Sequence, residues 1–307
     1  MLLRVPMKAL IGWILMILLA LITAGFLRLT YQQAHHLVHH PIDVRRPATR
    51  QPQDVNLQVQ ELVVLNSIGQ KLHAYFSPTH NGAYVMLQHG FKKNRSEMLE
   101  EAKILQDAGY GILVTSVRAH DLNEGEAITF GVKEVDDLHT WYNYLINVQG
   151  AAKTKVGLLG NSMGAAMAIE YAAVNQAIAA VVAVSAFSSL DDTINVSVEY
   201  FTGLPAFPFA PMVSLWAETI LDMETEQVDA TKAAAQLCHT PLLIMQGGQD
   251  IVISVASGQW LYDAACGDKQ LWFEESLGHT QFDTQKPNQF RRRVLEFFDQ
   301  YLLPSRR

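Results

Sequence analysis

The sequence contains no internal repeat and no low-complexity tract, and charged side chains make up only 17% of its 307 residues. The lack of repeats excludes a solenoid or another repeat array, and the low charge excludes a disordered, highly charged chain. Apolar residues account for 49%, a globular composition with ample material for a hydrophobic core. About 257 residues follow the first fifty, a length that suits one domain with a small insertion.

Positive charge is scarce beyond residue 50. The first fifty residues hold six basic residues and one acidic residue, a formal charge of +5. Because the net charge of the whole chain is −7, the remaining residues carry a charge of −12. An acidic body argues against nucleic acid as a partner, because phosphate binding needs a clustered positive face. The basic arm, which adjoins an apolar segment, instead indicates anionic lipid head groups.

Only two cysteines are present, Cys238 and Cys266, and each shortly precedes a strand-like run, at residues 241–246 and 270–274. If those strands are parallel neighbours, both thiols lie at the same edge of the sheet, within disulfide reach. A disulfide would indicate an oxidising compartment. The alternative is two unpaired cysteines that act as small core residues.

Residues 9–28 are predicted to form a transmembrane anchor, preceded by a short basic amino terminus at residues 1–8. Residues 9–27 carry no charge and are long enough to cross about 30 Å of hydrocarbon as a helix. The alternative is a cleaved signal peptide, with residues 23–25 as the cleavage site. We expect a single-pass membrane protein with its catalytic domain on the extracytoplasmic side.

Residues 29–54 are predicted to be a basic linker, extended where three prolines and three arginines fall between residues 41 and 52. The histidine pairs at 35–36 and 39–40 have the i, i+4 spacing of a helical metal site. They lack a carboxylate, so we interpret them as a solvated interfacial face. No metal and no cofactor are expected.

From residue 55 onward, strand-like and helix-like segments alternate, and residues 55–65 are predicted to open the sheet as an antiparallel strand. Further strands are predicted at residues 71–76, 83–88, 111–117, 156–159, 180–185, 241–246 and 270–274, and helices at residues 96–107, 133–147, 163–173, 254–264 and 287–303. The alternation predicts an α/β fold over residues 55–307, with a mostly parallel sheet covered by helices on both faces.

Residues 187–237 interrupt this rhythm and are too long for a plain connection between two core strands. We predict a small helical lid at about residues 187–238. Its aromatic residues either line an apolar or acyl pocket or only pack the lid onto the sheet; they are Phe201, Phe207, Phe209 and Trp216.

The run Gly160-Asn161-Ser162-Met163-Gly164 lies between a strand-like and a helix-like segment. A serine on a sharp strand-to-helix turn projects from the top of the sheet, and the crowded backbone there favours glycine at both ends. Asp250 and His279 follow in the loops after two later strands, at the edge where a parallel sheet gathers functional groups. Ser162, His279 and Asp250 are therefore candidates for nucleophile, general base and orienting acid.

Four segments in this order resemble the α/β-hydrolase superfamily, and the resemblance covers nearly everything after about residue 55. Residues 160–164 resemble the nucleophile elbow, and His89-Gly90-Phe91 resembles the oxyanion loop. Residues 116–125 resemble a supporting loop of these enzymes, D-x-R-G-H-G-x-S-x-G, with departures at Ser116, Ala119, Asp121 and Asn123.

The resemblance implies a serine hydrolase that cleaves carboxylic ester or related acyl bonds through an acyl-enzyme, with the N–H groups of Phe91 and Met163 as oxyanion donors. A serine peptidase or amidase would use the same triad on a peptide substrate. A catalytically silent binding domain is the alternative from another class, and a dehalogenase would need Asp in place of Ser162. His120 is a rival base, although it precedes the serine in the chain.

Overall fold

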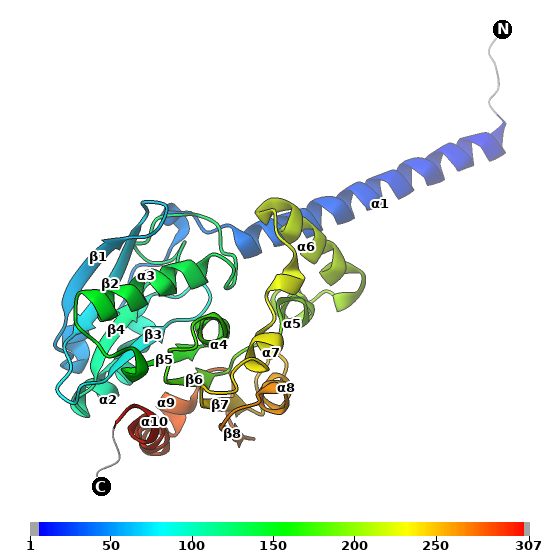
Figure 1. Cartoon of the computed structure of the whole chain (residues 1–307). Helices are drawn as coiled ribbons and strands as arrows, with labels where there is room; N and C mark the ends of the chain where they lie inside the picture. The colour runs from blue at the N-terminus through cyan, green and yellow to red at the C-terminus, as the bar shows by residue number, and fades with distance from the viewer. Residues whose placement is uncertain (1–5, 304–307) are drawn as a thin grey trace.

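An eight-stranded sheet forms the centre of the computed structural model, which describes residues 6–303 (Figure 1). The strands are β1 (Gln60–Leu65), β2 (Lys71–Ser77), β3 (Tyr84–Gln88), β4 (Gly111–Thr115), β5 (Val156–Asn161), β6 (Ala180–Val184), β7 (Leu242–Gly247) and β8 (Lys269–Glu274). Their order is β1-β2-β4-β3-β5-β6-β7-β8, with β2 antiparallel to both neighbours and β3 to β8 all parallel. The predicted α/β architecture is confirmed.

Helices cover both faces of the sheet, because the side chains of its central strands are buried on both sides. The helices of the body are α2 (Leu99–Asp107), α3 (Glu134–Asn147), α4 (Met163–Val174), α8 (Ser257–Ala264), α9 (Phe282–Gln285) and α10 (Pro287–Leu302). One apolar cluster joins the sheet to α3, α4 and α8, and a second joins the opposite face to α2, α9 and α10. Successive residues of β3 alternate between the two clusters, as a strand covered on both faces requires.

The first strand begins later than the sequence pattern predicts. Residues 52–55 form a 3-10 turn, η2 (Pro52–Val55), in which the Asp54 carboxylate accepts the N–H of Gln51 at 2.8 Å. Proline at the first position of a helical turn loses no hydrogen bond, so the local chemistry favours this turn over extension of β1. The predicted helix at residues 96–107 likewise opens as a 3-10 turn, η3 (Arg95–Met98).

The connection after β6 contains α5 (Leu190–Thr202), α6 (Ala206–Leu221), the 3-10 turn η5 (Thr225–Gln227) and α7 (Ala230–Ala234). The hydroxyl of Ser189 caps the start of α5, and Gly203 ends it with a φ of +67°. Of the four aromatic residues predicted to line or pack the lid, Phe209 and Trp216 pack against the core and Phe207 is 81% exposed. The side chain of Phe201 lies outside the described residues.

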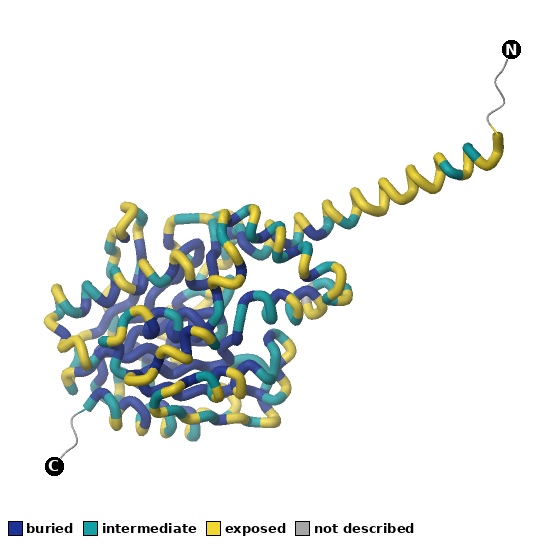
Figure 2. Tube along the Cα trace, turned by 45° about the vertical axis from the view of Figure 1, so that its right-hand side comes forward, coloured by how far each residue is buried: buried dark blue, intermediate teal, exposed yellow. Residues whose placement is uncertain are grey.

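The amino-terminal apolar segment is part of α1 (Met7–Val38), a helix long and apolar enough to cross a membrane by its length and composition. Figure 2 shows it exposed along most of its length, outside the body. Residues 1–5 of the predicted basic amino terminus lie outside the described residues.

The predicted linker at residues 29–54 is wrong for residues 29–38, which are helical and continue α1. Helix α1 continues to Val38, and Thr30, Ala34 and Val38 are buried against the body. The Arg45 guanidinium then donates to backbone carbonyls, including those of His40, at 3.0 Å, and of the 118–125 loop. When the segment docks on the body, these carbonyls gain hydrogen bonds from a charged donor. The composition of the segment alone does not predict these bonds.

Of the four histidines in this stretch, His35 and His36 are exposed as predicted, His39 is half-buried, and only His40 departs from the prediction. His40 is 5% exposed and its Nδ1 lies 2.7 Å from the carbonyl oxygen of Ala119. Among residues 6–303, no group of three or more histidine, cysteine, aspartate or glutamate side chains is arranged to hold a metal ion.

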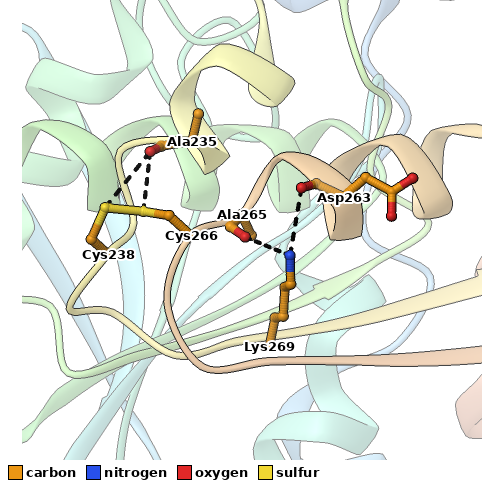
Figure 3. The surroundings of a disulfide bond; sticks show 6 residues. All are labelled: Ala235, Cys238, Asp263, Ala265, Cys266 and Lys269. Atoms are coloured by element: carbon orange, nitrogen blue, oxygen red, sulfur yellow. Dashed lines mark hydrogen bonds between the residues drawn. A yellow bond between two sulfur atoms is a disulfide. The ribbon is translucent and has the colours of Figure 1, made fainter.

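Cys238 and Cys266 are joined by a disulfide, so the alternative of two unpaired cysteines is wrong (Figure 3). The bond links the segments that enter β7 and β8, which pair in parallel with Leu242 opposite Lys269. The Lys269 ammonium donates to the carbonyl of Ala265 at 2.7 Å beside it. The bond lies at the amino ends of the parallel strands, away from the edge that carries Ser162.

Candidate active site

Ser162 occupies a sharp turn between β5 and α4, with φ of 54° and ψ of −119°. A Cβ atom on Gly160 would lie 2.3 Å from the carbonyl oxygen of Gly164, and one on Gly164 would lie 2.4 Å from that of Gln88. No side chain fits at such distances, so both glycines are required for the turn to pass under the neighbouring loop. The backbone N–H of Ser162 donates to the carbonyl of Val184 at 2.8 Å and fixes the turn on the sheet.

The three predicted side chains of the triad lie in one hydrogen-bonded chain. His279 Nε2 is 2.9 Å from Ser162 Oγ, and His279 Nδ1 is 2.7 Å from Asp250 Oδ2. The other oxygen of Asp250 accepts the N–H groups of Val252 and Ile253 at 2.9 and 3.1 Å. This orients the carboxylate toward Nδ1, which therefore carries the proton, and leaves Nε2 free to accept the hydrogen of the serine hydroxyl.

The residues predicted as oxyanion donors flank this serine. Met163 is the first residue of α4, where no preceding turn of the helix supplies an acceptor for its N–H. The loop that carries Phe91 lies directly against the elbow, since a Cβ on Gly90 would be 3.3 Å from the Cβ of Ser162. The ring of Phe91 stacks on that of Phe130, with 5.5 Å between centroids.

His89 and His120 are buried supports of the loops around the site. His89 Nε2 accepts the N–H of Val117 at 3.0 Å, and His120 Nε2 accepts that of Lys92 at 2.8 Å. The second nitrogen of each ring faces a backbone carbonyl, so both nitrogens are engaged. Burial lowers the pKa of both rings, that of His89 to about 4. With Nε2 bonded to the N–H of Lys92 and Nδ1 facing the carbonyl of Arg118, His120 has no free ring nitrogen to act as the base for Ser162.

Side-chain hydrogen bonds and ion pairs hold the loop at residues 116–125, including at positions where it departs from the resembled pattern. Asp121, which replaces a glycine, adopts a φ of 49°, and its carboxylate accepts from Ser116 Oγ at 2.7 Å and from Arg95 Nε at 2.6 Å. Arg118 is paired with the buried Asp137 through two hydrogen bonds, of 2.9 and 2.8 Å. These pairs position the loop and make no contact with Ser162.

Two carboxyl groups behind the elbow were missed by the sequence analysis. Glu97 Oε2 accepts the N–H of Gly90 at 2.7 Å, and Glu101 Oε1 accepts the Asn161 amide at 2.9 Å. Burial raises the pKa of both groups, that of Glu101 to about 8, with the nearby Asp283 adding to its shift. Their spacing of four residues, which puts both on one helical face, is the signal that was available.

Replacing Glu101 by Gln should flatten the dependence of stability on pH. The pKa of Glu101 rises from 4.5 to about 8 on folding, so the folded protein keeps a proton that the unfolded chain releases. The free energy of unfolding therefore falls as pH rises between these values. Gln keeps the acceptor for Asn161 and never ionises. The variant should therefore lose less stability than the parent between about pH 5 and pH 8, as measured by urea unfolding at both pH values.

Glu296→Gln, at an exposed position of α10, is the matched control and should follow the parent at both pH values. An equal loss of stability in the parent and in Glu101→Gln would show that Glu101 is ionised in the folded protein.

Comparisons with known proteins find one family model and several relatives that are similar to this chain. Residues 79–220 match the family model described as "Serine aminopeptidase, S33". The protein YqkD of Bacillus subtilis is 25% identical over 240 residues, which are 77% of this chain and 78% of that protein. Rv2307c of Mycobacterium tuberculosis is 23% identical over 85% of this chain and 86% of its own length.

Among solved structures, the Pyrococcus furiosus esterase Pf2001 superimposes with a TM-score of 0.71 at 24% identity, over 84% of this chain and 98% of that one. An esterase from Exiguobacterium antarcticum gives a TM-score of 0.58 at 16% identity, over 78% and 100% of the two chains. At these identities the likeness establishes the fold.

Proposed function

We propose that this α/β-hydrolase is a membrane-anchored serine hydrolase that cleaves carboxylic ester or related acyl bonds. The observation that carries the proposal is the chain of hydrogen bonds from Asp250 through His279 to the hydroxyl of Ser162, at 2.7 and 2.9 Å. A serine hydroxyl is a weak nucleophile at neutral pH, and a base in hydrogen-bond contact with it is the usual means of activation.

In the proposed mechanism, Ser162 Oγ attacks the carbonyl carbon while His279 Nε2 takes its proton. Asp250 stabilises the resulting imidazolium and holds its Nδ1–H in place. The N–H groups of Phe91 and Met163 bind the oxyanion, helped by the positive end of the α4 dipole. The leaving alcohol departs with the proton from His279, and water, deprotonated by the same ring, then releases the acid and restores Ser162.

A serine peptidase or amidase is the second candidate, because the matched family model is described as a serine aminopeptidase. The same groups serve both reactions, and they differ in whether an alcohol or an amine leaves. A panel of p-nitrophenyl esters and aminoacyl p-nitroanilides, run with purified full-length protein, separates the two. We expect faster turnover of the esters; a preference for the anilides would replace the esterase proposal and keep the triad.

A catalytically silent binding domain predicts a different result in the same experiment. It would turn over neither class of substrate, and a fluorophosphonate probe would leave well-folded protein unlabelled. Labelling at Ser162 supports the serine hydrolase.

The membrane assignment rests on α1 and the disulfide. The exposed apolar part of α1 suits a single-pass anchor, and the Cys238–Cys266 bond favours an oxidising, extracytoplasmic compartment for the catalytic domain. Retention in the membrane pellet after alkaline carbonate extraction, with protease access to the body only from the outer side, is the expected result. Release of a shortened chain into the soluble fraction would indicate a cleaved signal peptide.

A further inference from the structure

The end of α1 that enters the body packs directly on the predicted lid. We name residues 26–45 the juxtamembrane segment. Trp216 of α6 donates its Nε1–H to Thr30 Oγ1 at 3.2 Å, and its ring meets the edge of Tyr31 with 5.5 Å between centroids. The rings of Phe26 and Phe209 lie 5.2 Å apart in the same interface. Helix α6 thus lies alongside α1 at the point where α1 leaves the body (Figure 1).

The same segment also contacts the loop that carries the proposed oxyanion donor Phe91. The Lys92 ammonium donates to the carbonyl of His36, and the backbone N–H of Lys92 donates to His120. Burial lowers the pKa of this ammonium to about 8.

The loop that carries Ile128 and Phe130 makes a second connection between the juxtamembrane segment and Phe91. The N–H of Ile128 donates to the carbonyl of Val38 at 2.8 Å. Two residues further on, the ring of Phe130 stacks on Phe91. The juxtamembrane segment therefore touches the lid on one side and two loops beside Ser162 on the other.

The lid carries exposed apolar side chains next to this junction. Phe207 at the start of α6 is 81% exposed and Leu215 is 51% exposed. Both lie on α6, the helix that packs against α1, so exposed apolar side chains occur on both helices of this junction. Arg28 and Arg46, both exposed in or beside the same segment, supply positive charge for anionic head groups. A surface of this composition suits the interface of a bilayer.

We propose that the lid is seated in the membrane surface and that the substrate is an acyl lipid, an ester of a long-chain fatty acid, drawn from that bilayer to Ser162 between α6 and the Phe91 loop. This inference rests on the proposed serine hydrolase function and specifies its substrate class. The bond that breaks is the ester bond: the acyl group passes to Ser162 Oγ, the lipid alcohol leaves with the proton from His279, and water releases the fatty acid.

The test uses the full-length protein in phosphatidylcholine vesicles that contain a minor fraction of phosphatidylglycerol. Hydrolysis of vesicle-embedded p-nitrophenyl palmitate is compared with that of water-soluble p-nitrophenyl acetate. Phe207→Ser should lower the rate on the palmitate about tenfold, because it removes one large apolar side chain from the bilayer contact. The rate on the acetate should stay unchanged. The anchor keeps the variant on the vesicle, so the loss reports substrate entry.

Leu215→Ser tests the same surface at a second position and should act in the same direction. Val174→Ser is the matched control: Val174 is 70% exposed at the carboxyl end of α4, the helix that runs away from Ser162. It should leave both rates unchanged.

Equal palmitate rates for the parent, Phe207→Ser and Leu215→Ser, with fluorophosphonate labelling of Ser162 intact, would overturn the membrane-lipid proposal and leave the serine hydrolase standing. A dimer in detergent that Phe207→Ser dissociates would assign this face to a second copy of the chain and overturn it as well. Loss of labelling and of acetate hydrolysis in the parent would remove the serine hydrolase, and this inference with it.

Discussion

Replacing Ser162 by Ala should abolish hydrolysis, with a fall in kcat of about 10⁶. The hydroxyl oxygen is the only atom lost, and it lies 2.9 Å from His279 Nε2. The turn should persist, because it is held by the backbone bond from Ser162 N–H to Val184 and by its two glycines. The measurement is kcat on a p-nitrophenyl ester, with fluorophosphonate labelling of the parent and the variant.

Ser276→Ala is the matched control for this prediction. Ser276 lies in the loop before His279, is exposed, and its hydroxyl donates only to the Glu274 carboxylate, at 3.0 Å. It should keep the rate and the labelling of the parent. Full activity or labelling in Ser162→Ala, with an unchanged circular dichroism spectrum, would mean that another residue is the nucleophile.

Replacing Asp250 by Asn should lower kcat by about 10⁴. One carboxylate oxygen accepts the N–H groups of Val252 and Ile253, so the carbonyl oxygen of Asn would stay there and its NH₂ would face His279. An amide donor opposite Nδ1 requires that the ring proton move to Nε2. The ring would then donate toward Ser162 and be unable to take its proton. Steady-state kinetics on the same ester measure the loss.

Asp263→Asn makes the same chemical change at an exposed position of α8, where the carboxylate only accepts the Gln259 amide, at 2.8 Å. Its kinetics should match the parent. If Asp250→Asn retained kcat within a few-fold while binding the fluorophosphonate as fast as the parent, Asp250 would have no orienting role.

The elbow and the alternation of strands and helices could be predicted because both depend on residues that lie close together in the sequence. The turn needs glycines at residues 160 and 164, two positions separated by only four residues, and a buried strand needs a short apolar run. The loops that carry Asp250 and His279 follow such runs, so the topology of a parallel sheet brings them to one edge. The order serine, aspartate, histidine along the chain then left few other candidates for the triad.

The two cysteines mark the limit of this reasoning. Their distance depends on β7 and β8 being neighbours, which sequence spacing leaves open. The carboxyl groups of Glu97 and Glu101 were missed for a related reason. Acidic side chains on a helix are ordinarily solvated, and only packing against Gly90 and against Asn161 at the end of β5 buries these two.

The sequence by itself determined the α/β alternation, the serine elbow and an apolar helix of membrane-spanning length, because each depends on neighbours along the chain. Only the tertiary structure decided that residues 29–38 continue that helix and that residues 29–45 dock on the body rather than form a free linker. Its contacts join Thr30 to Trp216, His36 to Lys92 and Val38 to Ile128. These partners lie far apart in the sequence, and the free energy of such contacts exists only once the sheet has brought them together.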